Sequence, residues 1–227
     1  MKTKLILSYL FILGVFCTYA NTGKYRLILV DDPATTITVG WDQLLGSVTS
    51  ATVHYGTVDH GINYASYAFS KTVDRTIGHK GMNNHFARLT GLSANTNYYF
   101  VLHDNEGTSQ RFWFRTAPDD NSRLSFIAGG DSRNNRTPRQ RANRLVSKLK
   151  PHAVLFGGDM TDTNSATEWQ EWFEDWQLTI ASDGRIFPII PARGNHETDA
   201  STIYNLFDTP ITNSYYAVTF GDDLIRT

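Results

Sequence analysis

Three apolar segments decide the fold of this chain: Leu124-Ser125-Phe126-Ile127-Ala128-Gly129-Gly130-Asp131, Ala153-Val154-Leu155-Phe156-Gly157-Gly158-Asp159 and Phe187-Pro188-Ile189-Ile190-Pro191-Ala192-Arg193-Gly194-Asn195-His196-Glu197. Short apolar runs bounded by turn residues predict buried strands. Each run leads into glycine and then into a residue suited to binding a metal ion. We therefore expect three strands that bring four side chains to one edge of a sheet, namely Asp131, Asp159, Asn195 and His196.

Two helices are predicted between these strands. Residues 137–140 form a capping-box pattern with Pro138 at the first helical position, and Pro151 ends the helix that follows. Residues 165–168 form a second capping box. It precedes four aromatic residues at helical spacing, which we interpret as a face packed on the sheet rather than a ligand platform: Trp169, Trp172, Phe173 and Trp176.

The alternation of strands and helices predicts a parallel sheet covered by helices. Asp159 follows Asp131 by 28 residues, which is close to the length of one strand–helix–strand unit. Strands joined in this way end at the same edge, where open α/β sheets bind ligands. Carboxylates can bridge two cations, an amide oxygen adds a neutral ligand and an imidazole can donate to a phosphoryl oxygen. The edge therefore has the residue types of a two-metal site.

The residues before this stretch, from 25 to about 116, predict an all-β domain. Their apolar side chains alternate with polar ones, and clusters of Gly, Asn and Asp separate the runs, which favours a sandwich of short strands. A polar break with a proline at 117–122 suggests a domain boundary, so we expect domains at 21–118 and 122–227. The alternating runs include Ile37, Val39 and Trp41, then Ala51, Val53 and Tyr55, then Tyr98, Phe100 and Leu102.

The first twenty residues predict a cleaved signal peptide. Lys2 and Lys4 precede an apolar run that is too short for a confident membrane span, and Ala20 ends a plausible cleavage site. We therefore expect a secreted, periplasmic or cell-surface protein without stable membrane insertion; Cys17 leaves a lipoprotein as an alternative. The formal net charge of −1 and the absence of Lys/Arg runs argue against a nucleic-acid partner.

Together these motifs resemble a known family. Gly130-Asp131, Gly158-Asp159 and Gly194-Asn195-His196-Glu197 look like the first three motifs of the calcineurin-like metallophosphoesterases. The sandwich in front is similar to the fibronectin type III-like amino-terminal domain of purple acid phosphatases, and residues 89–98 resemble its tyrosine corner. The resemblance implies a multidomain fold, in which an all-β sandwich is followed by the first part of an α/β metallophosphoesterase sandwich.

The resemblance also implies a reaction and roles for the site residues. Asp131 would bind the first metal, Asp159 would bridge both metals and Asn195 would bind the second. His196 would protonate the leaving group or stabilise charge on the phosphoryl group. The implied activity is hydrolysis of a small phosphomonoester by metal-activated hydroxide, with two divalent or trivalent ions of iron, zinc or manganese.

The chain departs from the family pattern in three ways. Asp162 stands where purple acid phosphatases carry a metal-binding tyrosine, so the metal identity is open. Arg133 replaces the family's histidine or glycine, and it either grips the substrate phosphate or pairs with an acidic neighbour. No histidine follows His196, and His152 starts the second strand, at the wrong end for the site. We therefore expect a carboxyl-terminally truncated chain that by itself cannot complete the dinuclear centre.

Other functions remain as alternatives at this point. The chain could be a non-catalytic binding or adhesion protein beside a degenerate phosphoesterase half, or a phosphodiesterase of the same superfamily. A zinc peptidase centred on His196 and Glu197 is disfavoured, because residue 200 is alanine where the helical H-E-x-x-H pattern needs a second histidine.

Overall fold

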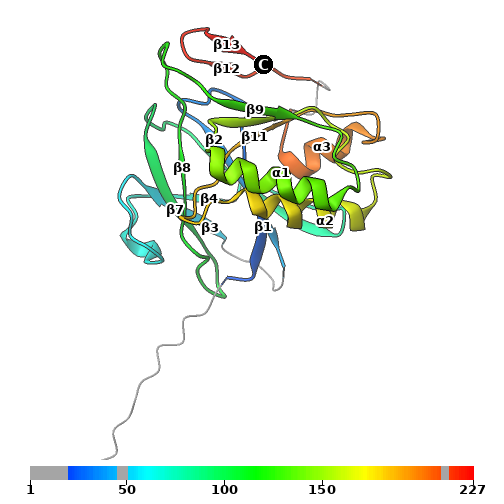
Figure 1. Cartoon of the computed structure of the whole chain (residues 1–227). Coiled ribbons are helices and arrows are strands. Elements are labelled where there is room, and N and C mark those ends of the chain that lie inside the picture. Colours follow the sequence, from blue (N-terminus) through cyan, green and yellow to red (C-terminus); the bar gives the residue numbers. More distant parts are fainter. Residues whose placement is uncertain (1–19, 45–50, 211–214) are drawn as a thin grey trace, which may run out of the picture.

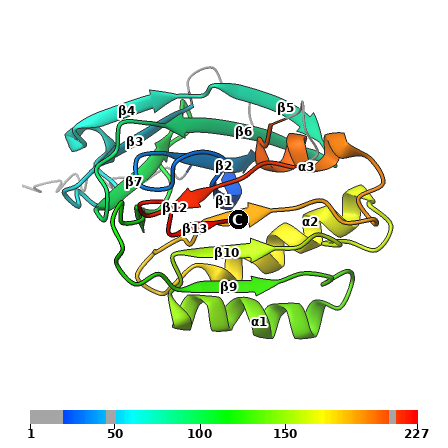
Figure 2. The same ribbon diagram turned by 90° about the horizontal axis from the view of Figure 1, so that it is seen from above.

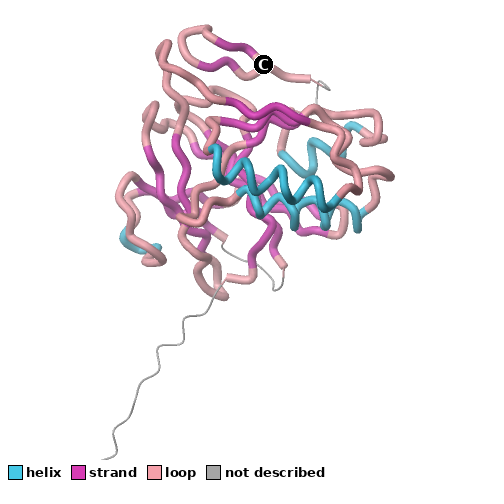
Figure 3. Tube along the Cα trace, in the orientation of Figure 1, coloured by secondary structure: helices cyan, strands magenta, loops and turns pink. Residues whose placement is uncertain are grey.

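The computed structural model describes residues 20–44, 51–210 and 215–227. In this part strands contain more residues than helices, and the α-helices are gathered on one side (Figures 1 and 3). The strands are β1 (Thr22–Ile28), β2 (Ile37–Gln43), β3 (Thr52–Gly56), β4 (Phe69–Thr72), β5 (Arg75–His79), β6 (Met82–Leu89), β7 (Asn97–His103), β8 (Phe112–Arg115), β9 (Phe126–Gly129), β10 (Ala153–Phe156), β11 (Ile189–Pro191), β12 (Thr219–Phe220) and β13 (Ile225–Arg226). The α-helices are α1 (Arg136–Leu149), α2 (Ala166–Trp176) and α3 (Ala200–Phe207), and short 3-10 helices span Tyr64–Ser66 and Gln177–Thr179. The predicted signal peptide, apart from Ala20, lies outside the described residues.

A seven-stranded sheet forms the centre of the molecule, in the order β5-β6-β2-β1-β11-β10-β9. Its β9, β10 and β11 are neighbours and parallel, as their strand–helix–strand spacing predicts. β1 lies parallel to β11, with Ile28 opposite Ile189, so the sheet continues from the second half of the chain into the first. The sheet therefore crosses the expected boundary at 118–122, and the domain bounds remain a prediction.

The two faces of this sheet are covered differently. Helices α1, α2 and α3 pack on one face, where Ile28, Val154 and Ile189 meet the aromatic side chains of α2. Figure 2 shows α1 and α2 beside β9 and β10, whereas α3 lies nearer β5 and β6. A four-stranded sheet, β4-β3-β7-β8, covers part of the other face. The parallel strands are buried best at β11 and the start of β10, whereas Ala128 and Gly129 at the end of the edge strand β9 are exposed.

The amino-terminal half has the predicted sandwich. Leu27, Val39 and Trp41 from the large sheet pack with Phe100 and Phe112 from the small one, and all five are nearly inaccessible to solvent. The corner motif also forms, because the backbone N–H of Ser93 donates to Tyr98 Oη at 2.8 Å. The predicted fold class, an all-β sandwich followed by an α/β unit, is confirmed.

The two predicted helices form, with one difference at a boundary. Ser165 caps α2 through the predicted reciprocal capping box, and the aromatic stripe of α2 is buried as core. The predicted cap at Thr137 is wrong: α1 begins at Arg136, and Asn135 is its N-cap without a side-chain capping bond. Pro138 fits in the first turn of the longer helix, since the first N–H groups of a helix have no intrahelical acceptor.

The carboxyl-terminal residues form a short hairpin. Strand β12 (Thr219–Phe220) pairs antiparallel with β13 (Ile225–Arg226). Phe220 packs edge-on against Phe126, so the hairpin covers part of the sheet face opposite the helices (Figure 1). None of the helices in the described ranges is long and apolar enough to cross a bilayer.

Candidate metal centre

The predicted edge exists. In the parallel ladder Leu155 lies opposite both Ala128 and Ile190, so β9, β10 and β11 end side by side. Asp131 follows the end of β9, Asp159 follows β10, and the Asn195–His196 pair follows β11. The four side chains named from the sequence thus come from three adjacent loops at the carboxyl edge of one sheet, where the residue spacing put them.

The loops after β9 and β10 are joined by their backbones. The N–H of Asp131 donates to the carbonyl of Gly158 at 2.9 Å, and the N–H of Arg133 donates to the carbonyl of Asp159 at 3.0 Å. Asp131, Arg133 and Asp159 all have positive φ angles, between 37° and 52°. Such angles are uncommon for residues other than glycine and cluster at functional sites, where surrounding structure holds them.

Glycines allow the loops after β10 and β11 to touch. Gly158 has a φ of 89°, and a Cβ there would lie 2.6 Å from the Cα of Gly194 and closer still to its nitrogen. A Cβ on Gly194 would in turn overlap the carboxylate of Asp159. Only hydrogen fits at both positions, which gives the Gly-Asp and Gly-Asn-His patterns a steric cause.

Glu197 holds the same two loops together. Its side chain is fully buried and accepts three backbone hydrogen bonds, from Asp159 at 2.9 Å, Met160 at 2.8 Å and Gly194 at 2.7 Å. Asp159 Oδ1 accepts a further bond from the N–H of His196 at 2.9 Å. Glu197 was not among the predicted site residues, although its position directly after Asn195 and His196 in the motif was a signal that could have pointed to it.

Three carboxylates at this edge surround one guanidinium. Arg133 Nε donates to Asp131 Oδ1 at 2.6 Å, its Nη2 lies 3.7 Å from Asp159 Oδ2, and its Nη1 lies 3.6 Å from Asp162 Oδ1. The hydrogen bond with Asp131 raises the pKa of Arg133. Of the two roles considered for Arg133, pairing with acidic neighbours is the one seen in the structure; binding of a substrate phosphate stays a prediction.

The side chains of His196 and Asn195 differ in their contacts at this edge. The Nδ1 of His196 lies 2.5 Å from the carbonyl oxygen of Asp162 and 3.6 Å from its Oδ1. With Nδ1 donating to the carbonyl, the Nε2 atom is left to accept or, in the imidazolium form, to donate a proton. Asn195 is exposed, and its amide has no hydrogen-bond partner among the described residues.

The side chains at this edge are of chemical types that bind metal ions. Carboxylate and amide oxygens suit divalent and trivalent cations that accept oxygen ligands, and Asp162 adds an oxygen donor where the family has tyrosine. Over the described ranges, however, no group of three or more His, Cys, Asp and Glu is arranged to hold an ion. The carboxylates face Arg133 instead, so a cation already stands at their centre. His152 contributes nothing here, since it pairs with Ser125 at the opposite ends of the strands.

A second link ties the β9 loop to α2. Asn134 Nδ2 donates to Glu168 Oε1 at 2.6 Å, and the N–H of Thr163 donates to Glu168 Oε2 at 2.8 Å. Burial raises the pKa of Glu168, but these bonds and the capping bond from Ser165 together lower it from 4.5 to about 2.

This lowered pKa predicts a pH-dependent contribution to stability. A carboxylate with a depressed pKa in the folded state stabilises the protein above its unfolded pKa, and the contribution disappears as the pH falls through the folded pKa. We expect the difference in unfolding midpoint between wild type and Glu168→Gln to be full above pH 5 and to vanish toward pH 2. Urea titrations followed by circular dichroism at several pH values measure it; a difference that stays constant across this range would contradict the assignment.

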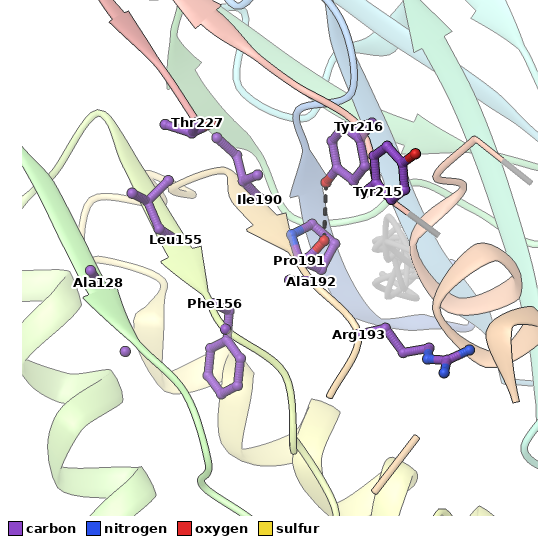
Figure 4. Close-up of a pocket in the computed structure, with 12 residues that line it drawn as sticks. Ala128, Leu155, Phe156, Ile190, Pro191, Ala192, Arg193, Tyr215, Tyr216 and Thr227 are labelled. Atoms are coloured by element: carbon purple, nitrogen blue, oxygen red, sulfur yellow. Dashed lines mark hydrogen bonds between the residues drawn. The ribbon is translucent and has the colours of Figure 1, made fainter. Parts of the chain in front are cut away.

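A cavity of about 480 Å³ lies on the sheet face opposite the helices (Figure 4). Ala128, Leu155 and Ile190 form its floor, and Tyr216 bounds it by donating from Oη to the carbonyl of Pro191 at 3.2 Å. Burial raises the pKa of Tyr216. None of the predicted site residues lines this cavity, and its lining is mainly apolar. Gly157, Ala192 and Arg193, from the loops that lead to the metal edge, line the rest of it together with the carboxyl-terminal residues Tyr215 and Thr227.

Two family models match the chain, one on each side of the predicted boundary. Residues 24–116 match the purple acid phosphatase N-terminal domain, and residues 133–224 match the calcineurin-like phosphoesterase family. The chain is therefore similar to a purple acid phosphatase N-terminal domain followed by a calcineurin-like phosphoesterase domain. The resemblance stated from the motifs is therefore confirmed, and the candidate metal centre lies in a metallophosphoesterase-like region.

Relatives and solved structures agree with this purple acid phosphatase-like organisation. The chain is 26% identical over 194 residues to an uncharacterised protein of Mycobacterium tuberculosis, matched in two strains, and this covers 78% of the chain but 36% of the relative. The purple acid phosphatase PPD1 from yellow lupin seeds has a similar fold, with a TM-score of 0.63 at 15% identity over 78% of this chain and 36% of that one. PhoD gives a TM-score of 0.58 at 11% identity over 92% of this chain and 51% of PhoD. The chain thus spans about a third of the length of the curated relatives it matches.

Proposed function

We propose that the protein is an exported, metal-dependent phosphatase that hydrolyses small phosphomonoesters at a site for two metal ions. The observation that supports this most is the convergence of Asp131, Asp159 and the Asn195–His196 pair at one sheet edge, in a chain that matches two phosphoesterase family models. The basic and apolar character of residues 1–20 supports export, and the net charge of −1 favours a small substrate over nucleic acid.

The metal-holding roles follow the order of the loops. Asp131 would hold one ion, Asn195 the other, and Asp159, which lies between their loops, would bridge the two. Asp159 suits this role because Glu197 fixes its backbone and the N–H of His196 occupies its Oδ1, which leaves Oδ2 directed toward the cation position. When bound, iron, zinc or manganese ions would supply an activated water and neutralise charge on the phosphoryl group.

His196 is the proposed proton donor. Its Nδ1 is held by the Asp162 carbonyl, so the ring cannot turn freely and its Nε2 keeps one direction. A histidine fixed in this way can protonate the leaving oxygen or stabilise charge on the phosphoryl group.

The test is a comparative assay with the protein produced from its complete gene. We expect hydrolysis of p-nitrophenyl phosphate to exceed that of bis-p-nitrophenyl phosphate, to stop on addition of a chelator, and to fall by about a hundredfold or more in Asp159→Asn, because a metal ligand is lost. Asp222→Asn, an exposed aspartate of the terminal hairpin, is the control and should match wild type. Equal rates in all samples would contradict the proposal, and a preference for the diester would make the protein a phosphodiesterase.

A further inference from the structure

Hydrogen bonds of its backbone, as well as contacts of its side chain, fix the position of Arg133. Its N–H donates to the carbonyl of Asp159 at 3.0 Å, and its own carbonyl accepts a hydrogen bond from the buried guanidinium of Arg139 in α1. Its φ of 37° turns the chain off the path of β9 toward the neighbouring loops. The backbone is thus held from both sides, by the β10 loop and by α1, and the side chain starts next to the carboxylates.

The guanidinium also matches its surroundings in charge. Each of its three nitrogens faces a different carboxylate, those of Asp131, Asp159 and Asp162, at 2.6, 3.7 and 3.6 Å. Carboxylates from three loops repel one another when they gather at one edge, and a positive charge between them offsets that repulsion. Arg133 is the only cationic side chain that contacts Asp131 or Asp159 among the described residues.

We infer that Arg133 is a built-in counter-ion that occupies the cation position of the site, so that metal binding requires its guanidinium to leave the carboxylates. The inference rests on the proposed function, because it concerns the same carboxylates. It explains why Asp131, Asp159 and Asp162 converge without forming a coordination group, because each of these carboxylates faces a nitrogen of Arg133. The arginine lowers the affinity for metal while keeping the loops assembled.

Calorimetric titration with MnCl2 tests the competition directly, without any measurement of activity. Arg133→Gln removes the competing charge and should bind Mn²⁺ about two- to fivefold more tightly than wild type, the range expected for partly exposed ion pairs. Arg193→Gln is the matched control, because Arg193 lies in the β11 loop, next to Gly194, and makes no ion pair in the part of the chain that the structure describes. It should change the affinity by less than about twofold, through general charge alone.

The outcomes separate this inference from the proposed function. Equal Mn²⁺ affinity in wild type and Arg133→Gln, with binding lost in Asp159→Asn, would overturn the role of Arg133 and keep the metal site. An equal gain in Arg133→Gln and Arg193→Gln would overturn it too, since any nearby charge would then suffice. If no variant binds Mn²⁺ in a way that depends on Asp159, the proposed function fails and the inference falls with it. Circular dichroism of each variant confirms that the fold is retained.

Discussion

Glu197→Ala should lower the free energy of unfolding by about 3 to 4 kcal/mol, because three backbone N–H groups lose their acceptor inside the protein. Leaving a buried donor unpaired costs roughly 1–3 kcal/mol, and three such groups lie within two adjoining loops. The site should suffer as well, since Asp159 and Gly194 are both held by this carboxylate. Urea denaturation gives the change in stability, and calorimetry with MnCl2 gives the change in metal affinity.

The control for this prediction is Glu174→Gln on α2, an exposed glutamate whose contact with Arg136 is 3.4 Å long. It should change stability by less than about 0.5 kcal/mol, as surface substitutions usually do. Glu197→Gln is expected to fall between the two, because an amide keeps one accepting oxygen but presents an N–H₂ group to a donor. A Glu197→Ala variant as stable as wild type would show that water or a neighbouring side chain satisfies the three N–H groups.

Gly158→Ala should have a similarly large effect, with a loss of about 2 to 4 kcal/mol in unfolding free energy from backbone strain and overpacking together. The positive φ of Gly158 disfavours any side chain, and the added methyl would meet the backbone of Gly194, which cannot move aside like a flexible side chain. Separation of these two loops would also displace Asp159 from Asn195. We therefore expect weaker Mn²⁺ binding as well as lower stability.

Gly129→Ala is a matched control for the same experiment. Gly129 ends β9 just before the site, its φ is not positive, and nothing lies within 4 Å of a Cβ built there. Alanine should be tolerated within about 0.5 kcal/mol. Equal stability of the two variants would mean that the loops after β10 and β11 separate easily, and that the close approach of Gly158 and Gly194 does not hold the edge together.

Much of the site could be predicted from the sequence because strand order followed from spacing. The segments ending at Asp131 and Asp159 are one strand–helix–strand unit apart, and such units place consecutive parallel strands side by side with their ends aligned. The capping box at Ser165 and the aromatic face of α2 are likewise local patterns, and both appear as predicted. The roles of Asp131, Asp159, Asn195, His196 and Arg133 remain predictions, which the experiments above address.

Two features of the site could not be predicted from the sequence near the residues involved. Glu197 accepts hydrogen bonds from backbone N–H groups 37 and 38 residues earlier in the chain. Arg133, in the loop after β9, pairs with Asp159 and Asp162 in the loop after β10. Backbone donors carry no residue identity, so the sequence cannot show which carboxylate they bind. An arginine that could form ion pairs with several acidic residues likewise has its partners determined only by the folded positions of the loops.

The sequence by itself determined the apolar segments, the helices between them and the edge to which the polar residues are carried, because these depend on periodicity and on the turns that glycine and proline permit. Only the tertiary structure decided how the two halves join. β1 pairs with β11 and extends one sheet across the expected boundary, through backbone hydrogen bonds that any residues can make. It also decided that the three carboxylates face Arg133, because long-range electrostatic pairing depends on distances that the order of residues does not contain.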